Sequence, residues 1–170
     1  MILPVRYKDF SVKFTTKNIK MQFTPRALNL FLLRHIPIAR IAGIRVKEHD
    51  NDKTLLQLTH RWLNQNPFRS IYFGVLVMAG ELATGIPLYR AVAESGKNIS
   101  MLVLRNESVF HKKATGKISV VFENDGLIAE KLRQAEETGE AVRFWLESKA
   151  YNASGQCVAE FRYEWSVKRR

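Results

Sequence analysis

A single carboxylate interrupts an otherwise apolar stretch in the middle of the chain. Residues 71–89 form a segment of 19 residues in which Glu81 is the only charge. A buried carboxylate is costly unless it is paired or used, and burial raises its pKa toward a value suited to accepting a proton near neutral pH. Glu81 is therefore a candidate general base or nucleophile. The alternative is a structural role, in which Glu81 satisfies a neighbouring polar group or pairs across a dimer interface.

Three further candidates precede Glu81. Asn66 lies 15 positions before it and has an amide that could orient water or a carbonyl group. Phe73 and Gly74 fall at the expected start of the apolar helix, where unpaired N–H groups favour negative charge. Gly74 has no Cβ, which lets a ligand approach closely. The structural alternatives are a turn at Asn66-Pro67, a core position for Phe73 and tight packing at Gly74.

The sequence gives little support for a metal site, a disulfide or a serine nucleophile. The four histidines share no metal-ligand spacing; they are His35, His49, His60 and His111. Cys157 is the only cysteine, which excludes an internal disulfide and a thiolate cluster. It alternates with the apolar residues of its strand, so we expect an inert core side chain. Neither a serine nucleophile elbow nor a phosphate-binding loop is present. We predict no metal site and no resident cofactor.

The elements that must position these residues begin with a helix. Thr24-Pro25 is a typical helix start, and Pro37 is expected to end this helix. Residues 43–48 and 54–61 predict a β-hairpin. A long helix follows over residues 71–94. Its length is borderline for a membrane span, but Glu81 at its centre favours a helix buried in a soluble protein.

Strands dominate the remainder of the chain. Residues 98–110 and 114–123 predict matching strands on either side of a bend at Lys112-Lys113. A short helix follows, and residues 141–151 and 156–168 predict a second hairpin. Antiparallel strands around one long helix indicate an α+β fold with a single curved sheet. Such a sheet covers the helix on one side only, so we expect a homodimer or homotetramer.

Several of these residues resemble the hotdog-fold acyl-CoA thioesterases. The likeness rests on Asn66, on Tyr72-Phe73-Gly74, on Glu81 and on the segments 109–114 and 155–160. It covers residues 43–170 and is nearest to the phenylacetyl-CoA thioesterase-like branch, together with a related group of small bacterial proteins. One departure concerns the helix start, where the family often has His-Gly-Gly.

The resemblance implies a curved antiparallel sheet wrapped around a central helix, and hydrolysis of a coenzyme A thioester. It also implies a role for each candidate residue. Glu81 would be the base or nucleophile, Phe73 and Gly74 would supply the oxyanion site, and Asn66 would orient water or the carbonyl.

The charge balance bears on partners. Lys and Arg number 27 against 16 Asp and Glu, a formal net charge of +11. Such a charge either serves solubility or attracts an anion. Lys112 and Lys113 are candidate contacts for the phosphates of coenzyme A. No nucleic-acid-binding motif accompanies the charge, so nucleic acid and membrane are not expected partners. We expect one domain over residues 1–170, with an N-terminal extension of about residues 1–23, in the cytoplasm.

Two other functions remain open. A non-catalytic hotdog protein could hold an acyl-CoA or a fatty acid without turnover, and the altered helix start favours this alternative. A hotdog dehydratase or hydratase would need a histidine paired with an acid, and no histidine here is placed to meet Glu81.

Overall fold

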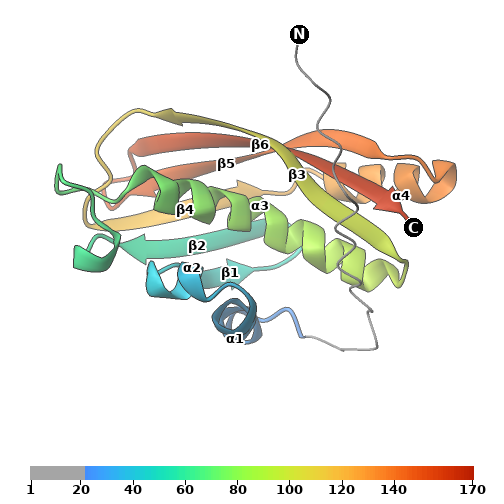
Figure 1. Ribbon diagram of the computed structural model, residues 1–170, viewed down its shortest axis with the longest axis horizontal. Helices are drawn as coiled ribbons and strands as arrows, with labels where there is room; N and C mark the ends of the chain where they lie inside the picture. Colours follow the sequence, from blue (N-terminus) through green and yellow to red (C-terminus); the bar gives the residue numbers. More distant parts are fainter. Residues whose placement is uncertain (1–21) are drawn as a thin grey trace, which may run out of the picture.

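The computed structural model describes residues 22–170, and its centre is one six-stranded antiparallel sheet. The strands lie in the order β1-β2-β4-β5-β6-β3. Their bounds are β1 Arg45–His49, β2 Lys53–Thr59, β4 Lys117–Glu123, β5 Val142–Asn152, β6 Cys157–Arg169 and β3 Ile99–Phe110. The long helix α3, Phe73–Ser95, runs across one face of this sheet (Figure 1). The predicted α+β architecture is confirmed.

Two glycines let α3 lie close to β6. A Cβ placed on Gly80 would come within 2.7 Å of a ring carbon of Phe161, and one on Gly85 within 3.2 Å of the Trp165 indole. The Tyr163 hydroxyl donates a hydrogen bond of 2.6 Å to the carbonyl of Val77. By length and composition alone α3 could cross a membrane. Its packing against the sheet shows instead that it is the core helix of the fold.

Three shorter α-helices and one 3₁₀ helix, η1 Trp62–Asn64, complete the fold of residues 22–170. Helices α1, Pro25–His35, and α2, Pro37–Ile41, lie beside the β1 end of the sheet (Figure 1). The Thr24 hydroxyl accepts from the N–H of Ala27, as expected of an N-cap. Pro37 ends α1 but also starts α2, because proline suits the first turn of a helix. Helix α4, Leu127–Thr138, packs on β5 and β6.

Both predicted hairpins form, β1 with β2 and β5 with β6. The strands on either side of the Lys112-Lys113 bend do not pair with each other. Strand β3 pairs with β6 and forms the edge of the sheet, whereas β4 lies between β2 and β5. The alternation of apolar residues defines which face of a strand is buried, but it does not identify the neighbouring strand.

A β-bulge near the start of β6 corrects the prediction for Cys157. Ala159 pairs with Ala150 and Cys157 pairs with Tyr151, which leaves Val158 as an extra residue. Val158 and Ala159 are both buried, so the alternation is interrupted. Cys157 therefore leaves the face that holds Ala159 and lies on the same side as Glu160.

The predicted N-terminal extension lies outside the described residues, except for Gln22 and Phe23.

Candidate functional site

Glu81 lies on the sheet-facing side of α3 and is largely buried. A Cβ placed on Gly85 would lie 3.1 Å from Glu81 Oε1 and 3.2 Å from the Trp165 ring, so the carboxylate and the indole both lie beside this glycine. Within residues 22–170, no hydrogen bond or ion pair engages the Glu81 carboxylate. Desolvation raises the pKa of Glu81 to about 7. A carboxyl group in this state can accept a proton from water near neutral pH.

Tyr163 on β6 is close enough to Glu81 to feel its charge, but its hydroxyl is hydrogen-bonded elsewhere. Burial, and then the charge of Glu81, raise the pKa of Tyr163 well above its usual range. Its hydroxyl donates to the Val77 carbonyl and so has no proton left for Glu81. The phenol therefore stays neutral and fixes the position of α3.

The first turn of α3 offers backbone donors. No side chain caps the helix at Tyr72. Val75 and Leu76 donate their N–H groups to the carbonyl of Tyr72. The N–H groups of Phe73 and Gly74 precede these bonds in the first turn, where helix geometry provides no intrahelical acceptor. They can therefore bind an anionic oxygen.

A groove of about 340 Å³ lies at this end of α3. Four of the predicted site residues line it: Asn66, Phe73, Lys112 and Lys113. Its other lining residues are mostly apolar or small: Phe68, Ser70, Ile71, Leu76, Phe110, His111 and Ala114. Lys112 and Lys113 are exposed at its rim, directly after the end of β3. An apolar groove with a basic rim suits a ligand that has an apolar tail and an anionic head.

Asn66 has a structural role in the wall of this groove. Its Oδ1 accepts from the N–H of Phe68 at 2.9 Å and from the N–H of Ser70 at 3.2 Å. Its Nδ2 lies 3.0 Å from Ser70 Oγ. The amide therefore closes the Asn66–Ser70 turn, which is the structural alternative that the sequence left open.

Glu81 and Gly74 do not line the groove. Glu81 follows Phe73 by two helical turns, so about 12 Å of helix axis separates the carboxylate from the first-turn donors of the same chain. One thioester carbonyl cannot contact both groups within a single chain. Any mechanism that uses both Glu81 and the first-turn N–H groups must account for this separation.

Sequence reasoning missed the aromatic residues around both parts of the site. Phe110 packs edge-to-face against Phe73, with ring centroids 6.1 Å apart, and so extends the groove wall. Trp165 and Tyr163 surround Glu81 from β6. The alternation of β6 already put these two side chains on the inner face, but only the structure places that face beside Glu81.

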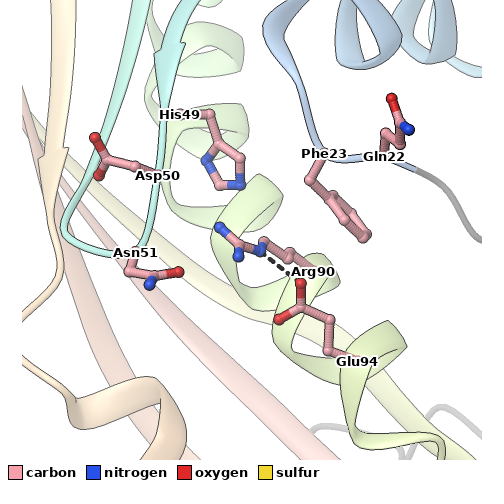
Figure 2. A pocket seen from close by; sticks show the side chains of 7 residues that line it. All are labelled: Gln22, Phe23, His49, Asp50, Asn51, Arg90 and Glu94. Carbon is pink, nitrogen blue, oxygen red and sulfur yellow. Dashed lines mark hydrogen bonds and ion pairs between the residues drawn. The ribbon is translucent and has the colours of Figure 1, made fainter.

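A second pocket, of about 500 Å³, lies at the opposite end of α3 (Figure 2). His49 Nδ1 lies 2.9 Å from Thr54 Oγ1, and Arg90 donates to Glu94 at 2.8 Å. Burial, and then the charge of Arg90, lower the pKa of His49. None of the predicted site residues lines this pocket, so we assign the candidate site to the groove and Glu81.

The family described as a domain of unknown function, DUF4442, matches residues 24–167. No protein with curated annotation matches the chain in sequence. Among solved structures, PA5026 of Pseudomonas aeruginosa, described as a protein of unknown function and "probable thioesterase", is 22% identical. It covers 86% of this chain and 97% of its own, with a TM-score of 0.72. Thioesterase HI1161 of Haemophilus influenzae is 15% identical and covers 87% and 92%, with a TM-score of 0.65. At these identities the likeness establishes the fold, and the predicted hotdog fold is confirmed.

Proposed function

The chain belongs to the DUF4442 family, and from that premise we propose that it is an acyl-CoA thioesterase. The observation that carries the proposal is the Glu81 carboxylate, which is largely buried, has no cation partner among the described residues and has a pKa of about 7. A stable fold gains nothing from such a group, because burying an unpaired carboxylate costs free energy. A general base needs a group of this kind.

In the proposed reaction, ionised Glu81 takes a proton from water as the water oxygen attacks the thioester carbonyl carbon. The N–H groups of Phe73 and Gly74 stabilise the resulting oxyanion. The carbon–sulfur bond then breaks, the carboxylic acid is released, and the coenzyme A thiolate takes the proton from Glu81. Lys112 and Lys113 hold the coenzyme A phosphates at the rim, and the acyl group lies in the apolar groove.

Because about 12 Å separates Glu81 from the first-turn donors of the same chain, the proposed reaction needs two chains at each site. We infer a homodimer in which the α3 start of one subunit faces Glu81 of the other. Two antiparallel copies of α3 related by a two-fold axis would create two identical composite sites. The dimer thus completes the site as well as covering the exposed side of the helix.

The test is a hydrolysis screen of the full chain against acyl-CoAs of short, long and aromatic acyl groups. We expect release of free coenzyme A, and a loss on the order of 10²-fold or more in kcat for Glu81→Gln. Glu94→Gln is the matched control, because Glu94 lies on the same helix, paired with Arg90 and away from the groove. Full turnover by Glu81→Gln on every accepted substrate would overturn the assignment of Glu81.

The second candidate, non-catalytic binding of an acyl-CoA, is favoured by the Tyr72-Phe73-Gly74 helix start. The Tyr72 ring lies over Gly74, since a Cβ placed there would be 2.8 Å from Tyr72 Cε1. Calorimetric binding of a non-hydrolysable acyl-CoA analogue, without turnover of any member of the panel, would establish this function instead.

A nucleophilic role for Glu81 would create an acyl-glutamyl anhydride. Single-turnover hydrolysis in H₂¹⁸O detects an anhydride that water opens at the glutamyl carbonyl. Under general-base catalysis we expect the label in the acid product and none in the Glu81 carboxylate. Labelled Glu81, found by mass spectrometry of its peptide, would show the anhydride route.

A further inference from the structure

Three potential metal ligands meet where the end of β3 reaches the start of β6. His111, Cys157 and Glu160 each offer one donor atom, and these atoms all lie within 4.8 Å of one another. Nε2 of His111 is 3.9 Å from Glu160 Oε2, and Sγ of Cys157 is 3.9 Å from Glu160 Oε1. Elsewhere in residues 22–170, no other three His, Cys, Asp or Glu side chains form such a group.

The β-bulge creates this cluster. In a regular strand, Cys157 and Glu160 would point to opposite faces, because they are three positions apart. The extra residue Val158 restores them to one face. The carbonyl of Val158 also accepts from the N–H groups of His111 at 2.9 Å and Lys112 at 3.3 Å. The bulge therefore places Cys157 and Glu160 on one side of β6, and it also fixes the backbone of His111.

The chemistry of the donors points to a borderline divalent ion. Zn²⁺ binds thiolate, imidazole and carboxylate groups, and its usual bond lengths place tetrahedral ligand atoms roughly 3.4–3.6 Å apart. The observed separations, 3.9 Å from each of His111 and Cys157 to an oxygen of Glu160 and at most 4.8 Å within the group, come within reach of this geometry by side-chain rotations. We propose that His111, Cys157 and Glu160 form a three-ligand Zn²⁺ site with a fourth position open to solvent. The sequence predicted no such site, because the ligands come from distant segments and share no local spacing.

Lys149 competes with the cation in this arrangement. It is the cross-strand partner of Glu160 on β5, and its Nζ lies 3.6 Å from Glu160 Oε1. Without a metal, this ammonium group satisfies part of the charge of the carboxylate. Removal of Lys149 should therefore strengthen Zn²⁺ binding, whereas removal of a ligand should weaken it. If Zn²⁺ bound nonspecifically to the surface, removing Lys149 would not strengthen binding while removing a ligand weakened it.

His111 also lines the groove beside Lys112 and Lys113. A bound ion would hold this rim segment to β6. Metal binding would therefore restrict the motion of the segment that carries Lys112 and Lys113. The Zn²⁺ site does not depend on the proposed hydrolase activity, and its test needs no substrate.

The experiment titrates the chelator-treated full chain with Zn²⁺ against a chromophoric competitor, and with Co²⁺ followed by absorption. We expect one ion per chain and a thiolate-to-Co²⁺ charge-transfer band. Cys157→Ser should abolish this band, and each of Cys157→Ser, His111→Asn and Glu160→Gln should weaken Zn²⁺ binding by more than about 10-fold. Lys149→Met should tighten it. Thermal unfolding of each variant checks that the fold is intact.

His35→Asn is the matched control, because His35 is exposed on α1 and belongs to no cluster within the described residues. Its affinity for Zn²⁺ should equal that of the wild type. Zn²⁺ binding that is absent, or unchanged by Cys157→Ser in a folded protein, would overturn the proposal, as would a Co²⁺ complex without the thiolate band.

Discussion

At neutral pH the Glu81 carboxyl is close to half ionised, because desolvation raises its pKa to about 7 from an ordinary value of 4.5. The folded state therefore binds more protons than the unfolded state between these two pH values. The free energy of unfolding is therefore highest below the unfolded pKa of 4.5, where Glu81 is neutral in both states, and it has fallen by its full amount once the pH has risen through 7. The same burial that makes Glu81 a useful base makes it a source of pH-dependent instability.

This linkage gives a prediction for Glu81→Gln. The amide cannot ionise, so the variant should match the wild type below about pH 4.5 and become progressively more stable than it between pH 4.5 and 7, with a constant difference at higher pH. The full difference corresponds to about 3 kcal/mol in the free energy of unfolding. Urea denaturation at several pH values measures it. A pH-independent difference for Glu81→Gln would contradict the raised pKa.

Catalysis should depend on pH in the opposite direction. A general base acts in its ionised form, so kcat/KM should rise with pH and level off above an apparent pKa of about 7. Activity and stability of the wild type would then change oppositely across this range. A flat profile of kcat/KM between pH 6 and pH 8 would argue against Glu81 as the base.

Among the elements, α3 depends on its two buried glycines. A Cβ on Gly80 would come within 2.8 Å of both a Phe161 ring carbon and the Tyr163 hydroxyl. Neither ring can retreat far, because both are buried and the Tyr163 hydroxyl is hydrogen-bonded to α3. The close approach of α3 to β6 is therefore incompatible with a side chain at this position.

We accordingly expect Gly80→Ala to destabilise the protein by about 1–3 kcal/mol, the usual cost of overpacking. The sign of the change is informative, because alanine in a helix without a clash stabilises by about 1 kcal/mol relative to glycine. Denaturant titration gives the value. A variant that is more stable than the wild type would show that α3 does not lie against β6 as described.

The elements also show which parts of the fold a sequence encodes locally. The N-cap at Thr24, the apolar run of α3 and the alternation within β6 are short-range patterns, and they predicted the corresponding elements. The bulge at Val158 is set by pairing with β5, so the alternation wrongly placed Cys157 in the core. The pairing of β3 with β6 is likewise tertiary.

The same distinction applies to the candidate site. The isolated charge of Glu81 and the basic pair at 112–113 are visible in the sequence, and Asn66 was identified as either a site residue or a turn. The sequence spacing could not show that the Asn66 side chain is used in the turn, because its hydrogen bonds depend on the conformation of residues 66–70. The distance between Glu81 and the helix start follows from helix geometry, but its consequence appears only at the scale of the whole molecule.

The whole molecule carries a net charge of +11, and the groove rim concentrates part of it. We expect the affinity for coenzyme A to fall with added salt, because opposite charges at an exposed rim are screened. Lys112→Ala with Lys113→Ala should reduce this affinity roughly 10-fold at low salt. Calorimetry measures both effects. The pair Lys47→Ala with Lys97→Ala, exposed outside the groove, is the control, and equal affinities for the two double variants would exclude the rim as the phosphate site.

The edge strand β3 exposes apolar side chains, among them Leu102 and Leu104, and its outer backbone groups have no neighbouring strand within the described chain. An uncovered apolar edge favours association with a second copy. In the dimer that we propose, the α3 start of one subunit faces Glu81 of the other. We expect sedimentation at micromolar concentration to show a dimer or a tetramer, and a stable monomer would exclude the composite site.

Complementation between two inactive variants tests the composite site directly. Phe73→Pro removes one first-turn N–H while keeping the helix start, because Tyr72 has an extended ψ of 133° that suits a following proline. Glu81→Gln removes the base. Unfolding and refolding the two variants together should restore about a quarter of wild-type activity, since half the dimers are mixed and each holds one intact site. Phe73→Ala, which keeps the N–H, separates loss of the ring from loss of the donor. If the mixture is no more active than its separate components while mixed dimers form, Glu81 and the helix start do not act across the interface.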